Sequence, residues 1–590
     1  MTGGDMDVFS RRPHGSHTVD GHFRRQPRHL AIIGAATSLI LLAAACVADP
    51  EDVVRPGPPA AASKAVGHES LPVAKPLPAP AATCTNAPAG WSLRENRQVG
   101  VMDVRPSRTA TGLGEVVGYL DSATAVCGQT MSVHLSARRG ATRLRLRALR
   151  IGDYQGLGSR QVWQSDVLTA RKQVEAVPTG PDRIITERWP TSTTFAVNAS
   201  WPPGMYLIEI APEGQGKPSF MPLIVRSSGT RSPYLVLVSD LTWLAYNDYG
   251  GRSLYFGPGK THAKSVANRS YVASTDRPIA GSGLRLVFSM NIPLVRFLSR
   301  NGLSYDVTTD SSLDAVPAQL NGQPTLLIGG HSEYWTKRMY DAAVQARDAG
   351  TNLGFLGANE IYWQGRIERD PRGRETALTV YRDSRLDRLA KSNPSTTTVQ
   401  WRHAPLLRDP AALVGQGMSA VGVSGPYVVN STPSWLFRGT NLKKGDVLDL
   451  AIGNEADAQE HPDGNSPANL QVVLRGVARA TGATKPSLIT AGYYTAPSGA
   501  GVFAAGTTYW VCNLDSTCPD NATPPATSVA IQRITLNLVT AFAVARAGRL
   551  HPSVGTAYES AAQLATRLPL GNPAVSTESQ HLLDIQRRHR

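Results

Sequence analysis

The sequence predicts a β plus α/β protein, with an N-terminal antiparallel β-sandwich followed by a mainly parallel, doubly wound α/β domain. Before residue 230, short strands of alternating polarity are separated by proline and glycine, which is typical of a sandwich. After residue 231, continuous apolar runs alternate with amphipathic helices, which indicates a sheet covered by helices on both faces. With 590 residues, 41% of them hydrophobic, the chain is long enough for several such units.

The first 45 residues are predicted to be an export signal. Residues 1–29 include five arginines, Leu30–Ala45 is apolar throughout, and Cys46 follows. The run LLAAAC resembles a bacterial lipobox, so Cys46 is the expected lipid attachment point. An uncleaved membrane anchor is the alternative. In both cases we expect the protein at the outer face of the cytoplasmic membrane or in the cell envelope, tethered by a Pro- and Ala-rich linker at 46–85.

The remaining cysteines indicate two disulfides. Four cysteines in an exported chain are expected to pair. A zinc site would need closely spaced CxxC pairs, which are absent. Parity and loop length predict that Cys84 pairs with Cys127 and that Cys512 pairs with Cys518.

The β-sandwich is predicted for residues 86–230. In residues 131–136 and 143–148 apolar side chains alternate with polar ones, which indicates two half-buried strands joined by a turn at 138–142. Further strands are predicted at Thr194–Val197, Met205–Ile210 and Leu223–Arg226.

The α/β domain is predicted for residues 231–550, with a sheet of the glutamine-amidotransferase or flavodoxin type. The expected strands are Leu235–Ser239, Val307–Thr308, Thr325–Ile328 and Asn352–Leu356, and the expected helices are Ile292–Arg300, Thr336–Ala349 and Ile531–Ala545. Residues 551–590 have few core signals and are expected to form a C-terminal tail.

Site-like residues follow three of these strands. The blocks are LAYNDYGG at 244–251 with SLYFGP at 253–258, GGHSEYW at 329–335, and GANEIYW at 357–363. In parallel sheets, sites form just beyond the carboxyl ends of the strands. We therefore expect the aromatic, acidic and amide side chains of these blocks to lie together.

These blocks, together with GNEAD at 453–457, resemble in order and spacing the large (beta) subunit of N,N-dimethylformamidase and its bacterial relatives, over roughly residues 95–550. The resemblance implies an amide hydrolase in which one ferric ion is held by two tyrosines and a glutamate. Carried over by motif, the metal ligands are Tyr206, Tyr246 and Glu333, and the catalytic residues are His331, Asn359, Glu455 and Arg382.

This ligand set suits a hard, strongly acidic ion such as Fe(III), because phenolate and carboxylate are anionic oxygen donors. A bound ion of this kind polarises a carbonyl group and lowers the pKa of water, which amide hydrolysis requires. Other interpretations remain open at single residues. A tyrosine such as Tyr206 is usually part of a core, His331 can be a satisfied buried histidine, and a Tyr-rich loop can stack on carbohydrate.

Arg382 departs from the family, which has a lysine in the corresponding segment. Arginine keeps the positive charge, but it cannot act as a proton-transfer base, and its fork suits a carboxylate or phosphate. Dimethylformamide is therefore not assigned as the substrate.

The sequence thus predicts an exported, lipid-anchored mononuclear-iron hydrolase that acts on the C–N bond of a small amide. The alternative is a non-catalytic envelope protein that binds polysaccharide or a partner through the sandwich. The net charge of +15 is not concentrated in a Lys/Arg block in the middle of the chain, which disfavours a nucleic-acid partner. Walker, GxSxG and HExxH motifs are absent, and the oligomeric state stays open.

Overall fold

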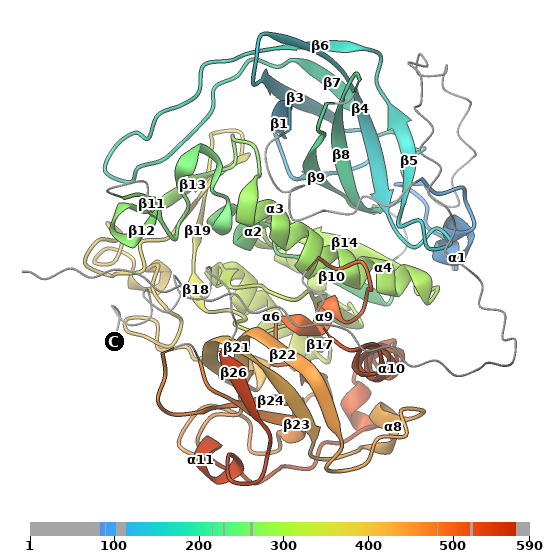
Figure 1. Ribbon diagram of the computed structural model, residues 1–590, viewed down its shortest axis with the longest axis vertical. Coiled ribbons are helices and arrows are strands. Elements are labelled where there is room, and N and C mark those ends of the chain that lie inside the picture. The colour runs from blue at the N-terminus through green and yellow to red at the C-terminus, as the bar shows by residue number, and fades with distance from the viewer. Residues whose placement is uncertain are drawn as a thin grey trace, which may run out of the picture. The chain divides into compact units, whose positions relative to one another are not determined.

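The computed structural model describes residues 83–573 except for residues 89, 102–113, 215, 228–230, 260–263, 481 and 520–522. The predicted export signal, Cys46 and all but the last residues of the linker lie outside the described residues. Within the described part, the chain is a mixed α/β protein with several sheets, many strands and few long helices (Figure 1). None of the described helices is long and apolar enough to cross a membrane.

The N-terminal part contains two sheets with a common hydrophobic core. One sheet has the order β1-β3-β7, and the other has the order β2-β9-β8-β4-β5 with β6 on β4. Side chains from both sheets, such as Met131 and Ile208, belong to one buried cluster. The strands are β1 (Val116–Leu120), β2 (Thr124–Ala125), β3 (Thr130–Ala137), β4 (Ala141–Ile151), β5 (Ser159–Gln164), β6 (Leu168–Arg171), β7 (Thr193–Ala196), β8 (Gly204–Pro212) and β9 (Ser219–Val225). All five strands predicted in this part are therefore present.

A ten-stranded sheet follows, with the order β14-β10-β15-β17-β25-β24-β23-β26-β21-β22. Its first five strands are parallel to one another. They are β10 (Tyr234–Val238), β14 (Tyr305–Thr309), β15 (Thr325–Ile328), β17 (Asn352–Phe355) and β25 (Gly501–Ala504). Each predicted strand of the α/β domain is found among them.

The other half of this sheet is mainly antiparallel, and here the prediction of a mainly parallel sheet is wrong. Successive long strands lie next to each other here, β21 beside β22 and β23 beside β24, and such neighbours need only short connections. The strands are β21 (Gly417–Val429), β22 (Val447–Ala458), β23 (Gln471–Ala478), β24 (Ser487–Thr495) and β26 (Leu570–Pro573). No strand or helix was predicted between residues 363 and 531, where most of this half of the sheet lies.

The parallel strands are buried on both faces, as their continuous apolar runs predicted. Along β10, Val236 belongs to one hydrophobic cluster and its neighbours Leu235 and Leu237 belong to another. Residues of α4 and α10 pack in the first cluster, and residues of α6 pack in the second. The predicted helices are therefore confirmed as α4 (Ile292–Arg300), α6 (Lys337–Ala349) and α10 (Pro525–Phe542).

The remaining elements are short. The helices are α1 (Trp91–Asn96), α2 (Asp240–Tyr246), α3 (Gly281–Leu286), α5 (Asp310–Ala315), α7 (Ala411–Val414), α8 (Ser434–Phe437), α9 (Tyr509–Cys512) and α11 (Ala561–Leu564). The strands are β11 (Gly257–Pro258), β12 (Lys264–Ser265), β13 (Val272–Ser274), β16 (Tyr334–Trp335), β18 (Trp363–Gln364), β19 (Arg366–Arg369) and β20 (Glu375–Thr379).

The residues after 550 do not form only a tail. Strand β26 pairs with β21 and β23, and Leu564 of α11 is buried in a small hydrophobic cluster with Val477. Short strands of this kind have too few residues for a recognisable alternation, so the sequence did not reveal them.

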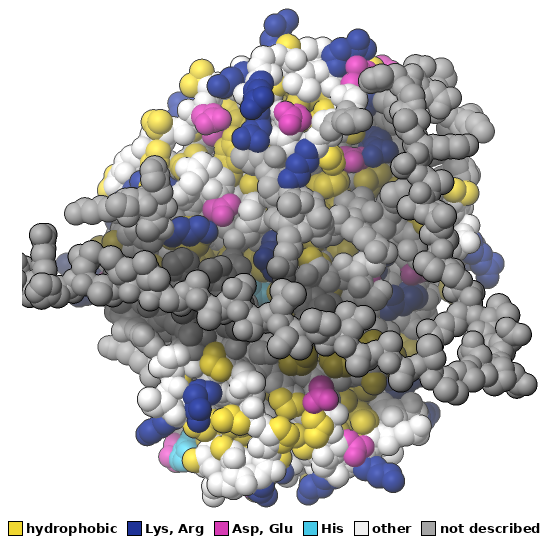
Figure 2. All heavy atoms as spheres, viewed as in Figure 1, with side chains coloured by type: hydrophobic (Ala, Val, Ile, Leu, Met, Phe, Trp, Pro, Cys, Tyr) yellow, Lys and Arg dark blue, Asp and Glu magenta, His cyan; other side chains and the backbone are white. Residues whose placement is uncertain are grey.

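On the face drawn in Figure 2, the visible Lys and Arg side chains of the described residues are dispersed among acidic and apolar ones. They do not gather into a single patch there.

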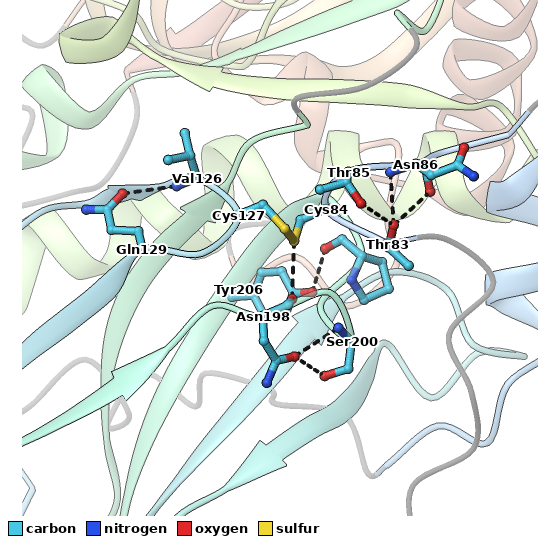
Figure 3. The surroundings of a disulfide bond; sticks show 11 residues. Thr83, Cys84, Thr85, Asn86, Val126, Cys127, Gln129, Asn198, Ser200 and Tyr206 are labelled. Atoms are coloured by element: carbon cyan, nitrogen blue, oxygen red, sulfur yellow. Dashed lines mark hydrogen bonds between the residues drawn. A yellow bond between two sulfur atoms is a disulfide. The ribbon is translucent and has the colours of Figure 1, made fainter.

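Both predicted disulfides are present. Cys84 is bonded to Cys127 and Cys512 is bonded to Cys518, and the Cα atoms of each pair are 5.3 Å apart. Figure 3 shows the surroundings of the first bond.

The two disulfides are expected to differ in their contribution to stability. Cys84–Cys127 closes a separation of 43 residues and Cys512–Cys518 closes one of 6. By loop-closure entropy the first contributes about 4 kcal/mol and the second about 2 kcal/mol. Urea unfolding of the Cys84→Ser/Cys127→Ser and Cys512→Ser/Cys518→Ser double variants measures both values. Equal losses of unfolding free energy would contradict this prediction.

Candidate active site

The residues that follow the parallel strands meet at one place, as predicted. Tyr246 ends helix α2 after β10, while His331 and Glu333 follow β15 and Asn359 follows β17. Because β10, β15 and β17 are neighbours in register, their carboxyl ends lie along one edge. These four side chains are all at most 7% exposed.

Two tyrosines and one glutamate lie at the centre of this cluster. The hydroxyl of Tyr255 donates a hydrogen bond to Glu333 Oε2, and the ring of Tyr255 lies 4.3 Å from that of Tyr246, centroid to centroid. Between them, Gly250 and Gly251 have φ angles of 76° and 80°, which favour glycine. The chain turns back there, so that Leu254 N donates to Ala245 O at 3.0 Å.

Helix α2 also fixes the backbone that carries the glutamate. Thr242 Oγ1 accepts a hydrogen bond from Glu333 N at 3.1 Å. Thr242 and Tyr246 are four residues apart and therefore lie on the same face of the helix. This face of α2 is turned toward the cluster.

His331 connects the central residues to a second carboxylate. Its Nε2 lies 3.3 Å from Tyr246 Oη, 3.4 Å from Glu333 Oε2 and 3.9 Å from Glu455 Oε2. Its Nδ1 lies 3.1 Å from the carbonyl oxygen of Ala358, which fixes the ring. Asn359 Nδ2 donates to Glu455 Oε2 at 2.7 Å, so His331 and Asn359 contact the same carboxylate.

Glu455 reaches this place although β22 is the last strand of the sheet. Ala456 forms a bridge with Thr507, just after β25, and Asp457 N donates to Gly506 O at 3.1 Å. Strand β22 thus lies beside the segment that follows the fifth parallel strand. The N–H of Asn359 is shared between the two carboxylate oxygens of Asp457, at 2.9 and 3.0 Å.

Arg382 contacts the cluster at Tyr334 and Tyr255. Its Nη2 donates to the hydroxyl of Tyr334, and that hydroxyl donates to the hydroxyl of Tyr255 at 2.8 Å. Arg382 and Asn359 both have left-handed backbone, with φ angles of 63° and 54°. Left-handed backbone is costly for a residue such as arginine, and such strain concentrates at functional sites.

Some polar atoms at the site have no partner. Asn359 Oδ1 and the Nε and Nη1 of Arg382 are buried without a hydrogen-bond partner among the described residues. Buried polar atoms of native proteins are nearly always paired, so these atoms are free to bind a ligand or water.

Burial governs the ionisation of the phenols. It raises the pKa of both Tyr246 and Tyr255 well above the usual value, and the nearby Glu333 carboxylate raises both further. Without a cation, both side chains therefore stay neutral. A bound multivalent cation reverses this preference because its charge favours the anionic form of each ligand.

His331 and the carboxyl groups of Glu455 and Glu360 have raised pKa values. Burial opposes the charge of His331, but the carboxylates of Glu455 and Glu333 raise its pKa to about 10. Burial raises the pKa of Glu455 to about 7, although His331 opposes the rise. Glu360, whose Oε2 accepts from Ser332 N at 3.0 Å, has a pKa raised well above its usual value by burial. The site can thus hold protons on carboxyl groups at neutral pH.

Tyr206 is not brought into this cluster, contrary to what the motif implied. It is fully buried in the core of the N-terminal sheets, and its hydroxyl donates to Pro202 O at 2.6 Å. Its ring lies 5.2 Å from that of Trp201, and Figure 3 draws it among the residues around the Cys84–Cys127 disulfide. The physical reason is that β8 is covered on this face, so its side chain completes a core.

Two residues of the cluster were not identified from the sequence as site residues. Tyr255 lies in the SLYFGP block and Tyr334 lies in the GGHSEYW block, both of which were recognised as following strands. The available signal was the glycine pair before Tyr255, which allows the chain to return to α2.

Three oxygen donors, Tyr246 Oη, Tyr255 Oη and a Glu333 carboxylate oxygen, could together hold a metal ion. In the described part of the chain, no three His, Cys, Asp or Glu side chains form a group that could do so. The phenol-rich set is of a different kind, because its donors are hard oxygens that suit a trivalent ion.

A cavity of about 70 Å³ lies on the other side of α2. Asp240, Leu241 and Leu244 line it from the helix, and Met221 and Tyr119 line it from the N-terminal sheets. The residues of the cluster around Glu333 do not line this cavity, so the cavity is separate from the candidate active site. The carboxylate of Asp240, which lines the cavity, accepts a hydrogen bond from Ser311 N at 3.1 Å.

The model of the family described as N,N-dimethylformamidase beta subunit-like, C-terminal, matches residues 145–522, which is more than half of the chain. No curated protein matches the sequence.

Proposed function

The chain belongs to the N,N-dimethylformamidase beta subunit-like, C-terminal family, and from this premise we propose that it is a hydrolase that cleaves the C–N bond of a small amide with the help of one Fe(III) ion. The observation that carries the proposal is the contact of Tyr246 and Tyr255 with Glu333 and His331 in one buried cluster.

In this proposal the metal ligands are Tyr246, Tyr255 and Glu333. Tyr255 is the second phenolate ligand, the role that the family motif implied for Tyr206. Two phenolates and one carboxylate balance a trivalent charge, which offsets the cost of burying each of them alone. When bound, the ion polarises the substrate carbonyl and makes a water molecule acidic.

The neighbouring residues supply proton transfer and orientation. Glu455, with a pKa of about 7, can give a proton to the leaving nitrogen at neutral pH. His331 Nε2 lies 3.9 Å from Glu455 Oε2 and 3.3 Å from Tyr246 Oη, so it can hold a proton beside the carboxyl group of Glu455. Asn359 Nδ2 donates a hydrogen bond to Glu455. The Oδ1 of Asn359 has no partner among the described residues, so it can accept a hydrogen bond from an N–H group of the substrate.

The proposal also covers the cellular location of the protein and its domain organisation. We propose that the protein is exported and anchored through Cys46, since two disulfides suit an oxidising compartment. We also propose that the two N-terminal sheets act as a sandwich domain at 86–230 and that the parallel strands belong to a doubly wound domain at 231–550.

The experiment that tests the function uses the full chain. Purified protein is analysed for metal, its visible spectrum is recorded, and a panel of primary, secondary and tertiary amides is offered. We expect about one iron per chain, a phenolate-to-iron absorption band and release of an amine. A colourless, metal-free and inactive protein would contradict the proposal and support the polysaccharide-binding alternative.

A matched pair of variants tests the identity of the second phenolate. Tyr255→Phe is expected to lose bound iron and the visible band, because it removes an anionic ligand. Tyr206→Phe is expected to keep both, because it removes only the hydrogen bond to Pro202, worth about 1 kcal/mol of stability. Iron analysis and absorption spectra check this prediction. Retention of iron by Tyr255→Phe together with its loss from Tyr206→Phe would restore the ligand set implied by the motif.

A further inference from the structure

The cavity beside helix α2 has room for a small ligand. Its volume of about 70 Å³ is enough for about five water molecules. Its wall includes Leu241 and Leu244 of α2 and Met221 of β9, all at most 6% exposed. Cavities with an apolar wall and a few polar groups are typical of small-molecule sites.

The charged groups that line this cavity are mostly acidic. Three of the described residues in its wall are acidic, namely Asp121, Asp240 and Glu375. Arg277 is the one basic residue among the described residues of the wall. Its Nη1 donates to the carbonyl oxygens of Tyr249 and Arg252, both at 3.1 Å, and its Nη2 donates to that of Asn247 at 3.0 Å. The guanidinium of Arg277 is therefore bound to backbone carbonyl groups and is not paired with these carboxylates.

Asp240 is the most buried of the three acidic residues, and it lies beside another carboxyl group. Asp240 begins α2 and Asp310 begins α5. Ser311 N donates to Asp240 Oδ1 at 3.1 Å, and Leu241 N donates to Asp310 Oδ2 at 3.2 Å. Asp240 is 8% exposed and Asp310 is fully buried. Among the described residues, neither carboxyl group forms an ion pair with a basic side chain.

The carboxylate of Asp240 thus lacks a compensating cation. Burial raises its pKa to about 6, so the group is mainly ionised at neutral pH. A buried negative charge is costly unless a cation is close to it. Because Asp240 lines a cavity, a ligand can supply that cation.

Glu375 adds a second, weakly paired carboxyl group. Burial and then the nearby charge of Asp240 raise the pKa of Glu375 to about 7. The ion pair of Glu375 with Arg369 is long, at 3.9 Å, because Arg369 Nη2 lies closer to Asp314, at 2.7 Å. The cavity wall therefore attracts positive charge near Asp240 and Glu375.

We propose that this cavity is a binding site for a small organic cation, a primary ammonium ion with a short apolar chain. The ammonium group binds the carboxylate of Asp240 near Glu375, and the chain packs against Leu241, Leu244 and Met221. In the described part of the chain, no three His, Cys, Asp or Glu side chains are placed to hold a metal ion, which favours an organic cation. The inference does not depend on the proposed iron site, whose residues do not line the cavity.

The test is titration calorimetry of the full chain at about pH 8, where Asp240 and Glu375 are both ionised and a primary ammonium group stays charged. The probe is n-butylammonium, and n-butanol and butyrate are its neutral and anionic counterparts of similar size. We expect one n-butylammonium ion per chain with a Kd at or below about 1 mM. Binding of n-butanol and of butyrate is expected to be at least about tenfold weaker, because neither supplies a positive charge.

Two variants of the wall and one control locate the site. Asp240→Asn keeps the size of the side chain and an acceptor for Ser311 N, but it removes the charge. It is expected to weaken n-butylammonium binding about a hundredfold, and Glu375→Gln is expected to weaken it about tenfold. The ligand-free Asp240→Asn protein is expected to be at least as stable as the wild type in urea, because an uncompensated buried charge is removed. The control Asp449→Asn changes an exposed aspartate of β22 and is expected to bind like the wild type.

Several results would overturn the proposal. One is that n-butylammonium does not bind, and another is that it binds Asp240→Asn as tightly as the wild type. Equal binding of n-butanol would mean that only the apolar wall selects the ligand. Tighter binding of butyrate would mean that the ligand pairs with Arg277, whose Nε has no partner among the described residues. If Asp240→Asn fails to fold by circular dichroism, Glu375→Gln decides, and an unchanged affinity of that variant would overturn the proposal. Iron content and amide hydrolysis do not enter these measurements, so failure of the proposed function is distinguished from failure of this inference.

Discussion

Replacing Glu333 with glutamine is expected to abolish iron binding and to reduce amide hydrolysis by about a thousandfold, because the metal supplies several kcal/mol of transition-state stabilisation. The substitution keeps the size of the side chain but removes its negative charge. Glutamine also cannot accept from Tyr255 as strongly as the carboxylate does. Metal analysis of purified protein and initial rates on the amide panel measure the two effects.

The matched control is Glu368→Gln, which changes an exposed glutamate on β19 that accepts from Thr379 Oγ1 at 2.9 Å. This control is expected to keep wild-type iron content and rate. A Glu333→Gln protein with one iron per chain would remove Glu333 from the ligand set.

A large loss of stability is expected from Glu95→Ala. Glu95 is fully buried on α1, where its Oε1 accepts from Arg160 Nε at 2.7 Å and from the Tyr154 hydroxyl at 2.9 Å. Arg150, which is 1% exposed, donates to the same Tyr154 hydroxyl at 2.8 Å. The variant leaves two buried arginines without their carboxylate, so we expect a loss of about 3–5 kcal/mol in the free energy of unfolding.

The contribution of Glu95 is also expected to depend on pH. Burial raises its pKa, but Arg150 and Arg160 together lower it below the usual value. A carboxyl group whose pKa is lower in the folded state stabilises the fold above its unfolded pKa of about 4.3. That stabilisation is lost as the pH falls through the folded-state pKa.

Urea unfolding at several pH values checks both statements about Glu95, with the exposed Glu115→Ala as control. The wild type is expected to lose its advantage over Glu95→Ala as the solution becomes acidic. A constant difference between pH 7 and pH 3 would contradict the assignment.

The sequence could predict those parts of the site that regular structure positions. His331, Glu333 and Asn359 follow buried parallel strands, and the register of such strands fixes where their carboxyl ends lie. The continuous apolar run of β15 and the helical periodicity of α4 and α6 are clear over their full length, so these elements could also be predicted.

The sequence could not decide between Tyr206 and Tyr255. Tyr206 lies on a strand in which seven successive residues are buried, so alternation does not tell which face its side chain occupies. Tyr255 depends on a turn at Gly250 and Gly251, and the direction of such a turn is set by contacts with α2 that are distant in sequence. Glu455 likewise depends on the bridge between Ala456 and Thr507, which joins segments about fifty residues apart.

Arg382 lowers the stability of the folded protein for two reasons. Its backbone has a φ of 63°, and its guanidinium is buried with two unpaired nitrogens among the described residues. Glycine at this position would relieve the backbone strain, worth about 1 kcal/mol, and the cost of burying the charge. Laboratory evolution for heat resistance alone is therefore expected to discard this arginine, whereas selection for catalysis is expected to retain it. Sequencing the survivors of the two selections would measure how far the working protein is held from its stability optimum.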